Sequence, residues 1–225
     1  MSEQHATQGL VLGVDTSTTV NVGLARAGEV LQVATVDDRM AHVEQLIPLV
    51  RQVLDRVGLQ VSDLTGVVVG LGPGPFTGLR VGIATARVLA SVVGVPLRGV
   101  CSLDVLAAQY AAEHPAGGFV VATDARRKEV YWACYDAAGV RLEGPEVSSP
   151  DGVPPLPTVG PGAQLYSDRL DAVLGPRVLD PGVLAARGWQ LADAGTEPLY
   201  LRRPDAALPT RRKSVLTWRV DRSVR

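Results

Sequence analysis

The sequence predicts an α/β protein of two lobes, each of which begins with a short strand that ends in aspartate. An internal correspondence supports this prediction: Leu10–Asp15 reads L-V-L-G-V-D, Phe119–Asp124 reads F-V-V-A-T-D, and a short turn and a returning strand follow each segment. A second observation is the apolar run 67–69, which passes through a glycine-rich turn into a helical pattern. The chain has 225 residues, of which 46% are hydrophobic, so both lobes can bury a core.

The first half of the chain is expected to hold five strands and three helices. Its opening strands follow from apolar alternation around a hairpin. The first helix has apolar residues at helical spacing on one face, and Pro48 should bend it or end its first part. Ser102 is a typical first residue of a helix, which should stop at Pro115. Strands are expected over 10–14, 20–25, 30–36, 67–70 and 97–100, and helices over 40–57, 77–93 and 102–114.

The second half repeats the opening pattern and then becomes less regular. Six prolines between Gly144 and Pro161 indicate a loop-rich insert. Two strands are expected over 119–123 and 130–135, and two helices over 163–173 and 183–194. The expected organisation is a first lobe over 1–103, a second lobe over 104–207 and a flexible basic tail over 208–225.

The helix expected over 77–93 carries a stripe of small residues. Gly78, Gly82, Ala86 and Ala90 recur every four positions, which places them on one face of the helix. Such a face lets another backbone come very close. Arginines interrupt the run, so the neighbour should be part of a soluble protein rather than a membrane helix. Two interpretations stay open: the stripe packs on the protein's own sheet, or it docks another molecule.

The turn after the first strand is a candidate phosphate site. Asp15 could hold a hydrated magnesium ion, and Thr16 and Ser17 could offer hydroxyls and amides to a phosphate. The alternative is a turn whose side chains bond its own backbone. The corresponding turn after Asp124 holds basic residues at 126–128, where close approach to a nucleotide would need glycine. We therefore expect a cleft that is at most a vestige of an ATP site.

Metal and nucleophile chemistry find little support in the residues. His5, His42 and His114 do not pair, and Leu46 stands four residues after His42, where a helical metal site would need a second histidine. Cys101 and Cys134 lie in apolar segments where a thiol is usually inert. No metal site, cofactor or catalytic set is therefore expected.

Composition and charge also narrow the classes of partner. The net charge of −1 gives no reason to expect nucleic acid or membrane binding over the whole surface. No apolar run is expected to reach the roughly 18 residues that cross a bilayer. The short polar start, residues 1–8, does not look like a secretory leader, and the two cysteines form no framework. These features favour a cytoplasmic protein.

Five motifs occur in order along the chain: V-D-T-S at 14–17, H-V-E-Q-L-I-P at 42–48, G-L-G-P-G-P-F-T-G-L-R-V-G at 70–82, D-A-R-R-K-E-V-Y at 124–131 and P-L-Y-L-R at 198–202. Together these motifs resemble the bacterial TsaB family, formerly called YeaZ. Two lobes that each open with strand, aspartate, turn and strand also resemble the actin, Hsp70 and sugar-kinase superfamily.

The resemblance implies an actin-like ATPase-type fold with a degenerate nucleotide cleft and a non-catalytic role. It implies work with a TsaD-type catalytic paralogue and a TsaE-type ATPase. That complex moves a threonylcarbamoyl group from threonylcarbamoyl-AMP to N6 of the adenosine 3′ of the anticodon, in tRNAs that read ANN codons. By the resemblance, the chain forms a homodimer when alone and meets tRNA only through the complex.

The resemblance also implies that the two helices of the first lobe form the partner surface. Leu46 then takes the place of the second metal-binding histidine of the paralogue. Two other classes of function are weighed against this one: an active ATPase or small-molecule kinase that uses Asp15 and Asp124, and a metallopeptidase. The interface residues expected by the match are His42, Leu46, Val50, Thr77, Gly78, Gly82, Ala86 and Ala90.

Overall fold

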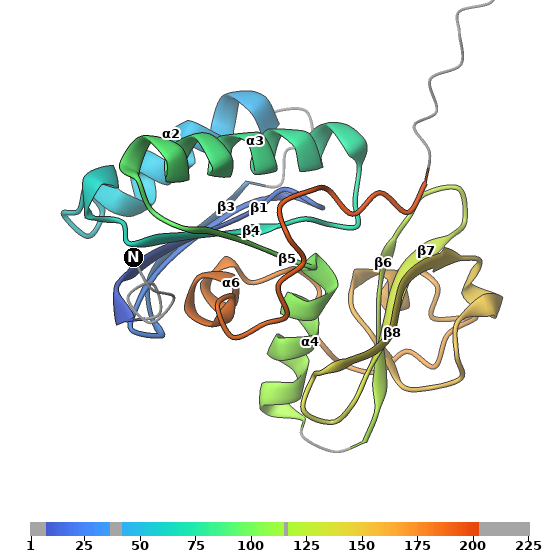
Figure 1. Ribbon diagram of the computed structural model, residues 1–225. Helices are drawn as coiled ribbons and strands as arrows, with labels where there is room; N and C mark the ends of the chain where they lie inside the picture. The colour runs from blue at the N-terminus through green and yellow to red at the C-terminus, as the bar shows by residue number, and fades with distance from the viewer. Residues whose placement is uncertain (1–7, 37–41, 115–116, 203–225) are drawn as a thin grey trace, which may run out of the picture.

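Two β-sheets form the framework of the computed structural model, which describes residues 8–36, 42–114 and 117–202 (Figure 1). The first sheet has the strand order β3-β2-β1-β4-β5, and the second has the order β8-β7-β6-β9. The strands of the first are β1 (Leu10–Asp15), β2 (Val20–Arg26), β3 (Glu29–Val36), β4 (Gly66–Gly70) and β5 (Leu97–Val100). Those of the second are β6 (Phe119–Asp124), β7 (Val130–Tyr135), β8 (Arg141–Ser148) and β9 (Thr158–Val159).

The two sheets repeat one topology, which confirms the predicted α/β fold with duplicated lobes. In each, three strands form an antiparallel meander, and a later strand adds in parallel to the first of them. Asp15 pairs with Asn21 and Asp124 pairs with Val130, so both aspartates occupy the last pair of their hairpin. The internal correspondence in the sequence therefore marks equivalent strand ends.

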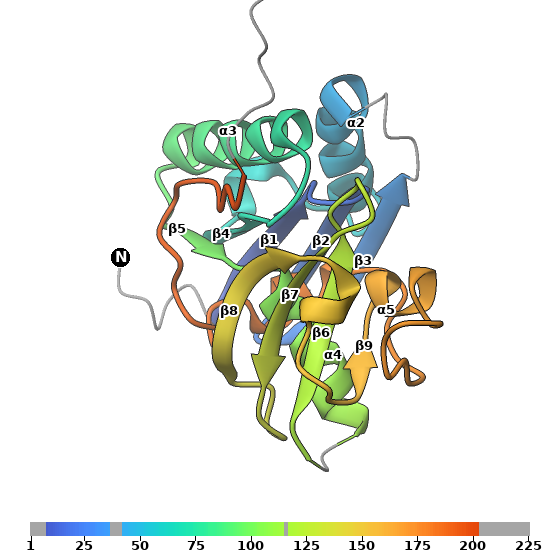
Figure 2. The ribbon, with the colours of Figure 1, turned by 90° about the vertical axis from the view of Figure 1, so that its right-hand side faces the viewer.

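Helices cover both faces of the first sheet. α2 (His42–Asp55) and α3 (Phe76–Val93) lie side by side on one face, and α6 (Pro181–Arg187) packs on the other face against β1, β2 and β3 (Figures 1 and 2). α2 continues through Pro48 to Asp55. α3 is followed by Gly94, whose φ of 77° suits glycine at a helix end.

Of the remaining helices, α4 joins the two halves of the molecule. α4 (Ser102–Glu113) begins at Ser102 as predicted and contacts both α6 and the second sheet. α5 (Pro161–Leu165) packs on β6, and two short 3₁₀ helices span Val61–Asp63 and Pro150–Gly152. α5 and α6 are shorter than the helices expected over 163–173 and 183–194. The region expected as a loop-rich insert contains the end of β8 and all of β9. The chain returns with α6 to the first sheet, and the predicted tail lies outside the described residues.

The small-residue stripe of α3 packs inside the protein. Gly78, Gly82, Ala86 and Ala90 are all buried. A Cβ atom added at Gly82 would lie 2.2 Å from Thr16 Oγ1, so α3 approaches the turn after β1 as closely as glycine allows. The interpretation of the stripe as an exposed docking surface is therefore wrong.

The other interface residues expected from the sequence differ in their exposure. Leu46 and Val50 are each 1% exposed and belong to the core between α2, α3 and the first sheet. Thr77 is exposed at the start of α3. The side chain of His42 lies outside the described part of the chain.

One helix among the described residues, α3, is long and apolar enough to cross a membrane by length and composition alone. The expectation that no run would reach this length is therefore wrong. The helix packs its small-residue face on the first sheet and carries exposed arginines at 80 and 87. Both features are those of a helix that packs one face on a sheet and exposes the other at the protein surface.

Candidate functional site

Four of the five sequence motifs meet in one region, which includes the junction of β1 with α3. Thr16 Oγ1 in the first motif donates to the carbonyl oxygen of Gly78 in the glycine-rich motif at 2.7 Å. Leu199 N in the last motif donates to Leu71 O at 2.9 Å. Arg202 Nη1 then donates to Ala125 O in the fourth motif at 2.7 Å. The segment 195–202 thus runs as a strap from the glycine-rich loop to the β6–β7 turn (Figure 1).

Asp15 lies at the centre of this junction and is fully buried. Its Oδ1 accepts hydrogen bonds from Ser17 N at 2.8 Å and Ser17 Oγ at 2.6 Å, and its Oδ2 accepts one from Ser102 Oγ at 2.5 Å. Burial raises the pKa of the Asp15 carboxyl above its ordinary value, although the hydrogen bonds from Ser102 and Ser17 act to lower it. Ser102 Oγ also accepts from Gly72 N at 3.1 Å. The carboxyl therefore ties β1 to the glycine-rich loop and to the start of α4.

The glycine-rich loop packs directly on the turn after β1. A Cβ atom at Gly70 would lie 1.7 Å from Asp15 Oδ2, and one at Gly74 would lie 2.5 Å from Ser17 O. The hydroxyls of Thr16 and Ser17 are both used in bonds within the protein. Of the two interpretations that the sequence left open, these contacts favour an internally bonded turn over a phosphate-binding turn.

The turn that follows Asp124 has an unusual backbone. Residues 126, 127 and 128 have φ values of 62°, 56° and 62°, although none of them is glycine. Asp124 Oδ1 accepts from Arg126 N at 2.8 Å, and Glu129 N donates to Arg126 O at 3.1 Å. Arg202 forms an ion pair with Glu129, in addition to its bond to Ala125 O. The strap therefore supports the turn from outside. The three basic side chains of the turn, at positions 126–128, are exposed.

A second polar cluster lies beside α4 and was not predicted from the sequence. Asp104 Oδ1 accepts from Tyr135 Oη at 2.8 Å and lies 3.4 Å from Arg141 Nε. Burial raises the pKa of Asp104, and the Arg141 charge opposes the rise. Burial and the nearby Asp104 raise the pKa of the Cys101 thiol to about 12. A single acid in the first turn of an apolar helix is too weak a signal to reveal this cluster.

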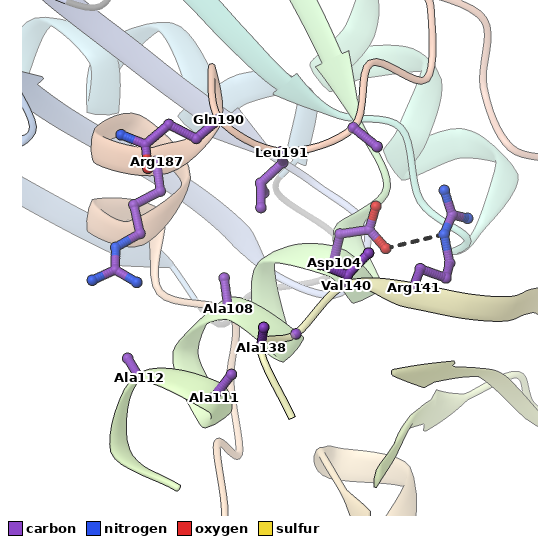
Figure 3. A pocket seen from close by; sticks show the side chains of 12 residues that line it. Asp104, Ala108, Ala111, Ala112, Ala138, Val140, Arg141, Arg187, Gln190 and Leu191 are labelled. Carbon is purple, nitrogen blue, oxygen red and sulfur yellow. Dashed lines mark ion pairs between the residues drawn. The ribbon is translucent and has the colours of Figure 1, made fainter. Parts of the chain in front are cut away.

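A cavity of about 460 Å³ opens next to this cluster (Figure 3). Alanines of α4 line one side, and Arg187, Gln190 and Leu191 line the other. Asp104 and Arg141 stand at one end, where their ion pair is drawn. The paired charges and the alanine lining mark a seam between α4, the β7–β8 turn and the segment after α6.

Large apolar side chains are exposed on both helices of the pair α2 and α3. Val88 is 60% exposed, Val92 is 79% exposed and Ile47 is 40% exposed. Val88 and Val92 stand one turn apart on α3, so they form one stripe on the side away from the sheet. Sequence reasoning missed these residues because it assigned the partner surface to the small residues, which lie on the opposite side of α3.

The structure also shows how the side chains that could bind a metal ion are arranged. In residues 8–36, 42–114 and 117–202, no three His, Cys, Asp or Glu side chains come close enough together to hold an ion. Asp15 instead bonds Ser17 in its own turn and Ser102 at the start of α4, and Asp124 bonds Arg126 in its own turn.

Comparisons with known proteins find a matching family model, curated relatives and similar solved structures. A family model described as TsaD, tRNA N6-adenosine threonylcarbamoyltransferase, matches residues 37–167. An uncharacterized protein of Mycobacterium tuberculosis is 42% identical over 205 residues, which are 87% of this chain and 93% of the relative. The tRNA threonylcarbamoyladenosine biosynthesis protein TsaB of Escherichia coli is 33% identical over 186 residues, 72% of this chain and 80% of the relative. The structure of YeaZ from Pseudomonas aeruginosa matches with a TM-score of 0.69 and 28% identity, over 86% of this chain and 100% of that one.

Proposed function

Because the chain belongs to the TsaB family, also called YeaZ, we propose that it acts in the biosynthesis of tRNA threonylcarbamoyladenosine as a non-catalytic dimerisation subunit. Its partner in this proposal is a TsaD-type catalytic paralogue, joined by a TsaE-type ATPase. The complex transfers a threonylcarbamoyl group from threonylcarbamoyl-AMP to N6 of the adenosine 3′ of the anticodon in tRNAs that read ANN codons. The chain forms a homodimer when the partner is absent and works in the cytoplasm.

The observation that carries the proposal is the exposed apolar face of α2 and α3. Ile47, Val88 and Val92 lie on two helices that cover one face of the first sheet and have no further layer of this chain described outside them (Figure 2). Exposed apolar side chains that gather on one face are typical of a protein interface. A helix pair of this kind fits the corresponding helices of a paralogue or of a second copy, since both would present a similar face.

The candidate reactive groups support a structural rather than a catalytic role. Asp15 is enclosed by three hydrogen bonds, and the Cys101 thiol has a pKa of about 12, so it is protonated at neutral pH. Burial and two nearby glutamates also raise the pKa of Cys134. A general base or nucleophile needs an accessible group with a pKa near the working pH. Asp15 instead joins β1 to the start of α4 through Ser102, and the two thiols lie buried in the core.

The experiment that tests the function is complementation of cells depleted of this chain. Wild-type protein should restore threonylcarbamoyladenosine in total tRNA, measured by mass spectrometry of nucleosides. The Val88→Asp/Val92→Asp variant should fail to restore it, because two carboxylates would be desolvated in the interface. Leu174→Asp is the matched control, since Leu174 is 83% exposed on the other half of the molecule and should restore the modification fully.

The outcomes separate the alternatives. Unchanged threonylcarbamoyladenosine after depletion contradicts the proposed function. Full restoration by the double variant contradicts the placement of the interface on α3, even if the function stands. Loss of restoration by both variants would show a general loss of folding, which circular dichroism of the purified proteins checks.

A further inference from the structure

The turn at residues 126–128 holds three cations in a conformation that costs energy. The left-handed region is unfavourable for a residue other than glycine, and here three such residues follow one another. The cost is offset locally by the bond from Arg126 N to Asp124 and by the contacts of Arg202 with Ala125 and Glu129. A backbone that bends in this way displays consecutive side chains outward from one small turn. All three basic side chains are exposed.

The strap links this turn to a cation and an aromatic ring at the start of α3 and carries a second ring of its own. Arg80 Nε donates to Tyr200 Oη at 3.0 Å, and the Arg80 guanidinium lies 3.7 Å from the centroid of the Phe76 ring. The rings of Phe76 and Tyr200 stack with centroids 4.7 Å apart. Tyr200 is two residues before Arg202, whose side chain contacts Ala125 O and Glu129 on either side of the basic turn. Tyr200 keeps 37% of its surface exposed.

Charge is concentrated on this surface in a way that the whole chain does not show. The basic turn, the strap and the start of α3 together hold five basic side chains and two acidic ones, and the acidic side chains pair with Arg126 and Arg202. The complete chain nevertheless carries a formal net charge of −1. A local positive surface on a slightly acidic protein indicates an anionic partner that is met at one place. The set, which we call the basic-aromatic surface, consists of Phe76, Arg80, Asp124, Arg126, Arg127, Lys128, Glu129, Tyr200 and Arg202.

We propose that the basic-aromatic surface binds tRNA directly, with the cations on backbone phosphates and Tyr200 against an unstacked base. This proposal rests on the proposed function, and it replaces the expectation that the chain meets tRNA only through its partners. Arginine and lysine neutralise phosphates, and exposed aromatic rings stack the splayed bases of single-stranded loops. An acidic protein would use the cations but would not need the exposed ring. The combination therefore favours RNA.

The test measures binding of an unmodified tRNA transcript to the chain assembled with its TsaD-type partner, by fluorescence anisotropy at several salt concentrations. The Arg126→Gln/Arg127→Gln/Lys128→Gln variant should weaken binding. It should also lower the slope of log K against log salt by about 2, which corresponds to three lost phosphate contacts on a single strand. The control is Arg26→Gln/Arg177→Gln, which removes two exposed cations outside α2, α3 and the basic-aromatic surface and should change neither quantity much.

Tyr200 separates base stacking from simple charge attraction. Tyr200→Leu should weaken binding about tenfold with little change in the salt slope, since stacking is worth 1–3 kcal/mol per base. Tyr200→Phe keeps the ring and should bind like the wild type. If both Tyr200 variants bind equally, the ring does not touch RNA and the stacking part of the proposal is wrong.

The remaining outcomes distinguish this proposal from the proposed function. If the complex forms and restores threonylcarbamoyladenosine, but the triple variant keeps wild-type affinity and slope, the RNA surface is refuted and the function stands. If the triple variant loses its TsaD-type partner while tRNA binding per assembled complex is unchanged, the surface is a protein interface. A complex that binds no transcript at all also overturns the proposal.

Discussion

Gly82→Ala tests the packing of α3 on the turn after β1, on which the assignment of the two faces of α3 depends. The added Cβ atom would lie 2.2 Å from Thr16 Oγ1, whereas real Cβ atoms essentially never come closer than 3.0 Å. Thr16 cannot rotate away freely, because its hydroxyl donates to Gly78 O at 2.7 Å in a buried site. The helix must move outward or that bond must break.

The size of the effect follows from two alternative costs and one gain. Overpacking of a buried contact costs about 1–3 kcal/mol, and an unsatisfied buried hydroxyl costs about 1–3 kcal/mol when relaxation breaks the bond instead. Alanine is preferred over glycine inside a helix by about 1 kcal/mol, which offsets part of the loss. We expect Gly82→Ala to lower the free energy of unfolding by about 1–3 kcal/mol, which lowers the urea midpoint by about 1 M.

Urea denaturation followed by circular dichroism measures this change. Ser91→Ala, on the exposed side of the same helix, is the control and should lie within about 0.5 kcal/mol of the wild type. Thr16→Ala removes Oγ1 but leaves Cβ at 3.2 Å, so the double variant should lose less than the sum of the single variants. If Gly82→Ala is as stable as the wild type or more stable, α3 does not contact Thr16 closely and the small-residue face is not buried.

Three further predictions concern single groups. The pKa of Asp15 is raised in the folded protein, so this carboxyl ionises at a lower pH in the unfolded chain than in the folded one. As pH rises from about 4 towards the folded pKa, the free energy of unfolding of the wild type should therefore fall relative to that of Asp15→Asn. Denaturation at several pH values would contradict this if the difference between the two proteins stayed constant. Lys128→Gly should raise the free energy of unfolding by about 1 kcal/mol, because glycine adopts the left-handed conformation without strain. Lys128→Ala should give no such gain. Equal stabilities of the two variants in urea would count against strain at this turn. The Cys101 thiol, with a pKa of about 12 and full burial, should resist a thiol reagent at pH 8 until urea unfolds the chain; rapid labelling of Cys101 in the native protein, located by peptide mapping, would refute its burial.

Local pattern was sufficient to predict the hairpins and the aspartates that end them. Apolar alternation followed by an aspartate and a short turn specifies a strand end without distant information, and Asp15 and Asp124 are found at equivalent positions. The helix at Ser102 was also predictable, because serine commonly lies at a helix start. By contrast, α6 has only seven residues, and its place against β1, β2 and β3 depends on contacts that no local pattern encodes.

The candidate site shows where the sequence was insufficient. Small residues every four positions indicate close approach but do not say to what, and Gly82 meets Thr16 of the same chain rather than a partner. Val88 and Val92 are apolar, so their exposure could not be told from burial by periodicity alone. The left-handed turn at 126–128 could not be predicted either, because residues other than glycine rarely adopt it.

Assembly with the catalytic paralogue is the most direct test of the account. Purified wild-type chain mixed with a TsaD-type partner should elute as one complex in size-exclusion chromatography, and so should Leu174→Asp. Val88→Asp/Val92→Asp should elute apart from the partner while its circular dichroism spectrum stays that of the wild type. Co-elution of the double variant with wild-type affinity, or failure of the wild-type chain to join the partner, would contradict the claim that the outer face of α2 and α3 docks a second protein.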